Sequence, residues 1–136
     1  QRDRRAPTST ARVLMQELAT LRARAMVSGR ATDLEAFDAP GSPALASDSD
    51  TLRRVRAAGV TYAGVHLTVR SARTVGAAGG RATVEAVVDT AAYRVVSAAD
   101  DHRVVRTEPA VRGQALRFAL VWSGGRWLVE RIEPAR

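Results

Sequence analysis

The sequence contains no cysteine, no lysine and no asparagine, and the first two absences exclude whole classes of site. Without cysteine, the chain forms no disulfide, no thiolate metal site and no cysteine nucleophile. A P-loop needs lysine, and the zinc-protease helix needs two histidines four residues apart, whereas His66 and His102 are far apart. No Gly-x-Ser-x-Gly elbow occurs either. We therefore expect no metal site and no cofactor.

Long apolar runs are also lacking, since none approaches the roughly 20 residues that cross a bilayer. All 21 basic residues are arginine and isoleucine occurs once. The codons of lysine and asparagine, and most codons of isoleucine, are rich in A and T. This composition therefore indicates a GC-rich, actinobacterial-type source. The net charge of +7 is partly a product of that bias. The chain starts at Gln1, and we expect an extracytoplasmic protein anchored to the membrane by a segment upstream of it; a cytoplasmic protein is the alternative.

Three helices are expected in the first half of the chain, after a disordered tail or linker over residues 1 to 8. The first begins at Ser9 or Thr10 and ends at Gly29, and its apolar stripe has helical spacing. Thr32 to Glu35 fits a capping box for a short second helix. Ser47 to Asp50 supplies cap residues for a third helix over residues 52 to 58. The stripe of the first helix comprises Leu14, Leu18, Leu21 and Ala25.

Strands are expected after Val60, where the hydrophobic period changes from about 3.6 to 2. Residues 65–70 and 82–89 alternate apolar and polar side chains across a Gly79-Gly80 turn. Near the end of the chain, Gly124-Gly125 forms the loop of a hairpin that places Trp122 opposite Trp127. Helices followed by strands predict an α+β domain, with three N-terminal helices packed in the concave face of a curved antiparallel sheet of four to five strands.

The element order and the closing Leu-Val-Trp-Ser-Gly-Gly-Arg-Trp-Leu-Val of residues 120–129 resemble the nuclear transport factor 2-like superfamily, the cystatin-like cones. The resemblance covers residues 9 to 133 and implies a single cone-type domain. It implies little about activity, because that superfamily contains isomerases, dehydratases, transport factors and accessory domains. It also implies homodimers formed through the outer face of the sheet.

An enzyme of that superfamily would place an acidic base inside the cone. The candidates here are Asp89 as base and Tyr62 or Tyr93 as the group that stabilises an enolate oxygen. Parity argues against them, because the rows of valine and alanine are better candidates for the core face. We expect Glu85 and its polar neighbours to form cross-strand charge pairs outside.

A binding role has its own candidates. Leu34 and Phe37 are predicted at the mouth of an apolar pocket, with Trp122 and Trp127 as its roof, although ordinary core packing explains all four. A second apolar row on the closing hairpin is predicted to lie on the opposite face and to form a homodimer interface. That row comprises Val121, Leu128 and Ile132.

Arg53, Arg56 and Arg70 lie in a basic segment that follows an acidic one, a split that suits a polyanion-binding adaptor. With only six aromatic residues and no stacking pairs on a strand, nucleic acid is not an expected partner. The function expected is a non-catalytic domain that binds a small apolar ligand or a protein. The alternatives are a small isomerase or dehydratase with an apolar pocket, and the basic adaptor.

Overall fold

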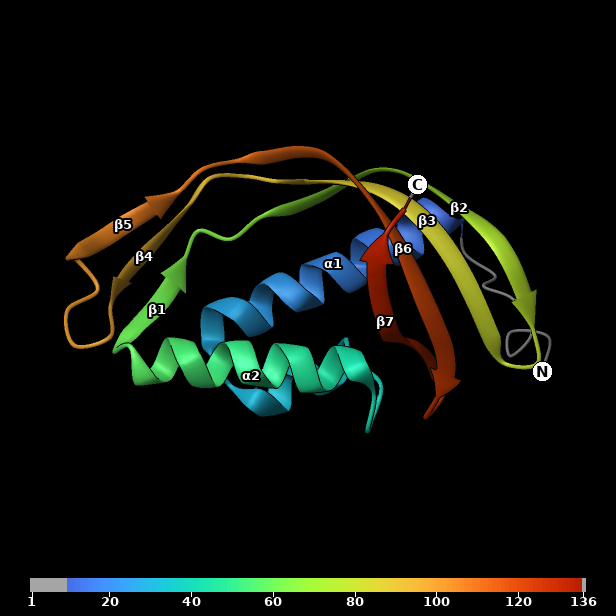
Figure 1. Cartoon of the computed structure of the whole chain (residues 1–136), viewed down its shortest axis with the longest axis horizontal. Coiled ribbons are helices and arrows are strands. Elements are labelled where there is room, and N and C mark those ends of the chain that lie inside the picture. The colour runs from blue at the N-terminus through green and yellow to red at the C-terminus, as the bar shows by residue number, and fades with distance from the viewer. Residues whose placement is uncertain (1–9, 136) are drawn as a thin grey trace.

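The computed structural model describes residues 10–135, in which all helices precede all strands (Figure 1). The helices are α1 (Ala11–Ser28), the 3-10 helix η2 (Ala31–Ala36) and α2 (Pro43–Ala57). The strands are β1 (Val60–Ala63), β2 (Leu67–Ala78), β3 (Arg81–Thr90), β4 (Tyr93–Ser97), β5 (Val104–Glu108), β6 (Val111–Ser123) and β7 (Arg126–Pro134). The predicted α+β class is confirmed. The tail or linker predicted over residues 1 to 8 lies outside the described residues.

Among residues 10–135, no helix combines the length and the apolar composition needed to span a bilayer.

The strands form two antiparallel sheets rather than the single sheet of four to five strands that we expected. One has the order β2-β3-β6-β7 and the other β1-β4-β5. Figure 1 shows β1 leading into β2, β3 into β4 and β5 into β6, so that the two sheets form one arch with α1 and α2 in its hollow. The ladder is interrupted at the bend, where the register shifts between Val88 and Thr90 and the next two residues leave the strand.

The first helix has the predicted ends. Thr10 caps it, since its Oγ1 accepts a hydrogen bond from the Val13 amide at 3.3 Å, and Gly29 ends it in the left-handed conformation at φ 70°. Its buried face shares Leu18 and Ala25 with the predicted stripe, but alanine and methionine side chains are buried in place of Leu14 and Leu21. That face comprises Met15, Leu18, Ala19, Ala23, Ala25 and Met26.

The next two helices differ from prediction. The expected capping box is absent from η2, because Asp33 instead accepts hydrogen bonds from Ser28 and Arg30. The third helix begins much earlier than residue 52: Ser42 is its N-cap and Pro43 its first residue. Proline suits that position, because a first-turn amide has no helical partner anyway. This early start places Asp48 one turn after Ala44 and one turn before Leu52, on the buried side.

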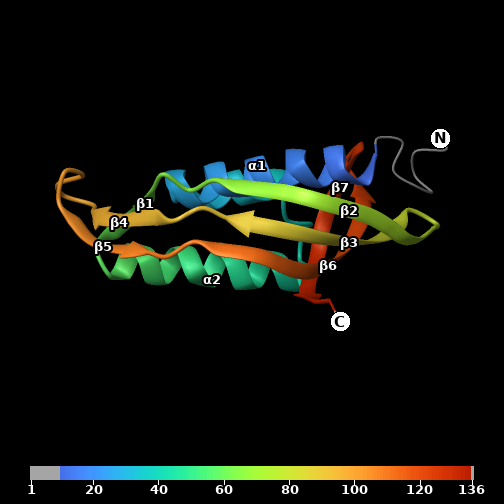
Figure 2. The same cartoon turned by 90° about the horizontal axis from the view of Figure 1, so that it is seen from above.

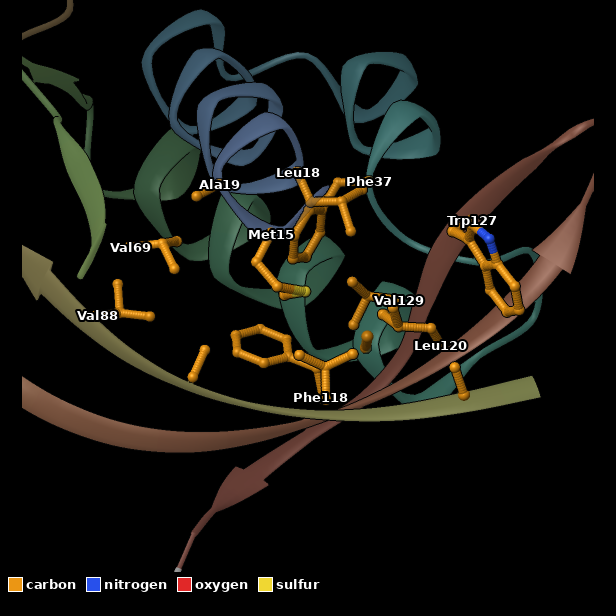
Figure 3. Packing of buried hydrophobic residues seen from close by; sticks show 14 residues of the cluster. Met15, Leu18, Ala19, Phe37, Val69, Val88, Phe118, Leu120, Trp127 and Val129 are labelled. Carbon is orange, nitrogen blue, oxygen red and sulfur yellow. The ribbon is translucent and has the colours of Figure 1, made fainter. Parts of the chain in front are cut away.

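The closing hairpin is confirmed. Gly124 and Gly125 have φ values of 61° and 85°, as a two-residue loop between strands requires. Trp122 pairs with Trp127 across the strands, and their rings meet edge to face with centroids 5.5 Å apart. Figure 3 shows Trp127 at one end of the buried cluster that lies between α1 and the four-stranded sheet.

The two faces of the four-stranded sheet have the predicted characters. Val84, Ala86 and Val88 of β3 are buried and face the helices. On the outer face, Glu85 accepts hydrogen bonds from Arg73 and from Arg117, which lie on the two flanking strands. These pairs lower the pKa of Glu85. The outer face is therefore a charged, solvent-exposed surface, and the apolar face of the sheet is the one that faces the helices.

Candidate functional site

A cavity of about 490 Å³ lies between the two α-helices and the inner face of the four-stranded sheet. This volume falls within the range of about 300 to 1,000 Å³ typical of small-molecule sites. Its walls are mostly apolar and come from α1, α2 and all four strands. The apolar lining residues are Met15, Ala19, Phe37, Pro43, Ala44, Leu67, Val69, Val88, Leu116, Phe118 and Ile132.

One charged pair lies among these apolar walls. Arg22 of α1 donates a hydrogen bond from Nη2 to Asp48 Oδ1 of α2 at 2.9 Å. The guanidinium also lies over the ring of Phe37, 5.3 Å from its centroid, at cation–π distance. The side chain of Arg22 is 29% exposed and that of Asp48 only 5%. Arg22 is therefore the partner that a molecule in the cavity can reach.

Behind this pair, a second carboxyl is buried. Asp38 is 1% exposed, and neither of its oxygens nor Oδ2 of Asp48 has a conventional hydrogen-bond donor among residues 10–135. Burial, and next the hydrogen bond and negative charge of Asp48, raise the pKa of Asp38 to about 8, against the opposing effect of Arg22. Asp38 is thus protonated at neutral pH and donates its one proton to Asp48, which gives one of its two oxygens a hydrogen-bond partner.

This arrangement limits what the site can do chemically. The oxygens of Asp38 and Oδ2 of Asp48 are sealed from solvent, so neither carboxyl offers a free oxygen to a substrate. A general base has to come within hydrogen-bond reach of the proton it removes. The guanidinium of Arg22, by contrast, is accessible and carries only donors. The geometry therefore suits binding of an acceptor group better than proton abstraction. Among residues 10–135, no cluster of three or more His, Asp or Glu side chains suits a metal ion.

The structure does not bring the predicted catalytic residues together in this cavity. Asp89 accepts a hydrogen bond from the Gly113 amide at 2.7 Å and lies 3.7 Å from Arg70, on the outer face. Tyr62 and Tyr93 pack against each other in the three-stranded sheet, 5.3 Å between centroids. Burial, followed by the neighbouring Tyr62, raises the pKa of Tyr93. None of these three candidates belongs to the cavity lining.

Of the four predicted pocket residues, Phe37 lines the cavity. Leu34 is fully buried in a separate cluster between α1 and α2. Trp122 and Trp127 close the far end of the sheet and contribute to the core, outside the cavity lining. The cavity lining thus includes Phe37 and none of the other three residues named for the pocket.

The apolar row predicted on the outer face is interrupted. Leu128 is only 4% exposed, and Val121 is half-buried. Ile132 does not lie on the outer face: it pairs with Phe118 and lines the cavity. The cause is a register shift in the β6–β7 ladder between Ala119 and Leu120, which adds one residue to β7 and turns the following side chains over.

The arginines of the predicted polyanion patch have partners and lie on different elements. Arg53 donates to Asp50, and Arg56 donates to the carbonyl of Gly29. Arg70 lies 3.7 Å from Asp89. The first two arginines are on α2 and the third is on β2, and these two elements are apart in both views (Figures 1 and 2).

Sequence reasoning missed Arg22, Asp38 and Asp48. A signal for Asp48 was present, since it has helical spacing from Ala44 and Leu52, and a polar residue in such a stripe indicates a buried site. Arg22 similarly lies four residues before Met26 and three after Ala19, within the buried face of α1. Asp38 gave no signal, because its burial depends on pairing between residues 37–39 and Val129 of β7.

No protein-family model and no curated protein matches the chain. Among solved structures, the chain is similar to the intermembrane space region of the chloroplast protein ARC6, with a TM-score of 0.69 and 21% sequence identity. The alignment covers 94% of this chain and 98% of that one. At this identity the similarity establishes a shared fold over nearly the whole of both chains.

Proposed function

We propose that this chain is a non-catalytic binding domain whose cavity holds a small, largely apolar ligand. The observation that carries the proposal is the cavity itself, a partly open pocket of about 490 Å³ between helices and sheet, whose lining is mostly apolar and includes the Arg22–Asp48 pair. Ligand sites are typically concave, with mostly hydrophobic walls and a few polar groups. A pocket of this size and composition therefore supports a ligand site.

The enzyme alternative, a small isomerase or dehydratase, has one observation in its favour, which is the carboxyl pair beside the cavity. Asp48 lines the cavity and Asp38 is protonated next to it. The sealed oxygens favour the binding domain, since a substrate would have to displace one carboxyl from the other before any proton could move. We therefore rank binding first.

The cellular setting is part of the same proposal. We infer a domain of the nuclear transport factor 2-like cone type that serves as the extracytoplasmic part of an anchored or exported protein. The arch with helices in its hollow supports the cone type, and the fold neighbour is an intermembrane space region. Protease treatment of intact cells that express the full-length protein tests this, because an extracytoplasmic domain is degraded and a cytoplasmic one is protected.

The ligand site is tested by filling it. Ala44 of α2 lines the cavity and is 7% exposed, whereas Ala46 on the same helix is exposed to solvent. With 1-dodecanol as a neutral apolar probe, we expect Ala44→Phe to weaken binding by about tenfold or more, because the ring occupies the space that the probe needs. Ala46→Phe adds the same side chain outside the cavity and leaves the affinity unchanged.

Titration calorimetry measures both variants, and thermal unfolding checks that each is folded. Equal affinity of the unchanged protein and a folded Ala44→Phe variant would place the probe elsewhere and contradict the proposed site. Failure of the unchanged protein to bind 1-dodecanol and likewise its charged analogues of equal chain length would contradict the proposed function.

A further inference from the structure

We propose that the ligand of this cavity is an amphipathic anion, an apolar body with one carboxylate head group, and that Arg22 is the residue that anchors the head. This inference rests on the proposed binding function and narrows it to a class of ligand. Three observations support it: the solvent exposure of the polar side chains, the contacts that order Arg22, and the net charge of the cavity lining.

The guanidinium of Arg22 is the accessible member of the polar cluster beside the cavity. The Arg22 side chain is 29% exposed, whereas the side chain of Asp48 is 5% exposed and the protonated Asp38 is 1% exposed. A cationic head group would need an open carboxylate oxygen and would meet a guanidinium instead. A carboxylate finds donors at once, and burial of these partners in an apolar pocket strengthens their interaction.

Arg22 is held in place before any ligand arrives. Asp48 accepts one hydrogen bond from Nη2 at 2.9 Å, and the ring of Phe37 lies under the guanidinium. Among acceptors in residues 10–135, only Asp48 takes a hydrogen bond from this side chain. A guanidinium has five N–H donors, so several stay available for a second, planar partner. A side chain that is already ordered loses less entropy when it binds a ligand.

The described lining of the cavity carries a net positive charge. With Asp38 protonated and donating to Asp48, the buried cluster contains one positive and one negative charge rather than a net negative charge. Arg131 of β7 and Gln114 of β6, both exposed, also line the cavity, and the described lining includes no carboxylate besides Asp48. The lining therefore has an excess of one positive charge, which favours an anion.

The apolar body has a matching wall. Met15, Val69 and Phe118 belong both to the cavity lining and to the buried core, and they extend from the helix to the sheet (Figure 3). A single-chain carboxylate that pairs its head with Arg22 can lay its hydrocarbon chain against them. Each methylene buried there strengthens binding by about fourfold.

The experiment compares three probes of equal chain length on the unchanged protein: dodecanoate, 1-dodecanol and dodecylammonium, each below its micelle concentration. Binding is measured by titration calorimetry at neutral pH. We expect dodecanoate to bind about tenfold more tightly than 1-dodecanol, as a charge-assisted hydrogen bond permits, and dodecylammonium to bind most weakly. This comparison needs no variant, so it stands whether or not the variants below fold.

The anchor is tested with the double variant Arg22→Gln/Asp48→Asn, which removes both charges and keeps a polar pair of nearly the same shape. Removal of Arg22 alone would leave a buried carboxylate unpaired. We expect the preference for dodecanoate over 1-dodecanol to fall sharply in the double variant, to what the exposed Arg131 alone supplies, with the affinity for the alcohol unchanged. The matched control is Arg54→Gln/Asp50→Asn, which removes an exposed ion pair of α2 that does not line the cavity.

The anionic ligand and the binding function are contradicted by different results. Equal affinities for dodecanoate and 1-dodecanol, or tightest binding of dodecylammonium, would overturn the anionic ligand while the binding function stands. If the folded double variant prefers dodecanoate over 1-dodecanol as strongly as the unchanged protein does, Arg22 is not the anchor. If none of the three probes binds, both the inference and the proposed function are contradicted.

Discussion

Asp38 is the residue whose chemistry depends most on the fold. It follows η2 directly, and the backbone on both sides of it pairs with Val129 of β7, which draws the carboxyl into the interior. A buried carboxylate without a donor is costly, and the group takes up a proton instead. The protonated form donates to Asp48, which in turn orders Arg22. The acid pair is thus a positioning device for an arginine.

The pH dependence of stability follows with a definite sign. The pKa of Asp38 rises from 3.8 to about 8 on folding, so between these values the folded state holds a proton that the unfolded chain releases. The contribution of Asp38 to stability is complete below the lower value and is lost as pH rises through the upper one, with a slope of at most about 1.4 kcal/mol per pH unit. Asp38→Asn keeps a neutral donor and removes this slope.

Urea unfolding at several pH values between about 5 and 8 measures the effect. Asp101→Asn, at a carboxyl whose side chain is 84% exposed, is the control and should leave the pH dependence unchanged. An identical pH dependence in Asp38→Asn and the unchanged protein would show that Asp38 does not hold a proton in the folded state.

At the scale of elements, α1 is fastened to the edge of the sheet by one side chain. The Gln16 amide accepts a hydrogen bond from Val69 N at 2.7 Å and donates one to Leu67 O at 3.0 Å. These are backbone groups of β2, the edge strand of its sheet. Gln16 therefore occupies the place of a neighbouring strand, and it holds the helix that carries Arg22.

Loss of this link should be measurable. We expect Gln16→Ala to lower the free energy of unfolding by about 1 to 2 kcal/mol, since two hydrogen bonds of ordinary net strength disappear. Glu17→Ala, at the exposed neighbouring position, should change it little. Urea denaturation of the three proteins makes the comparison. Equal losses in both variants would mean that the helix surface, and not the link to β2, sets the effect.

The same scale shows what the sequence could and could not predict. Trp122, Trp127 and the glycines between them specify the closing hairpin locally, so that element was predicted with its register. The start of α2 lies earlier than predicted because proline suits the first turn of a helix as well as the segment after one, and Pro43 occupies the first turn. The inward side of Ile132 was missed because the extra residue in β7 arises from tertiary pairing, which no local pattern records. Arg22 was missed because the buried face of α1 differs from the predicted stripe. Asp48 was missed because it lies in the part of α2 that precedes the predicted start.

At the scale of the whole molecule, the two flanks of the four-stranded sheet are already occupied. Gln16 binds one edge strand, and residues 37–39 pair with the other through Val129. The outer face carries ion pairs from Arg73 to Glu85 and from Arg81 to Glu130. These contacts leave neither edge of the four-stranded sheet free along its whole length, and they make its outer face charged.

The homodimer through the outer face stays a prediction, and only one of the three residues predicted for its interface still supports it. Of its three residues, Val121 remains half-buried on the closing strands, while Leu128 is buried and Ile132 faces the cavity. If the dimer forms, Val121→Asp should convert it to monomer, because a charge opposes burial at an interface. Sedimentation equilibrium gives the mass. A dimer unaffected by this change would have to use another surface.

The central claim is that a ligand enters the cavity, and amide chemical-shift mapping tests it most directly. With 1-dodecanol added to the isotopically labelled protein, we expect the largest shifts at Met15, Ala44, Val69 and Val88, which line the cavity. Arg73 and Glu85 on the outer face should stay nearly unchanged. Shifts confined to the outer face, or none at saturating probe, would contradict the claim.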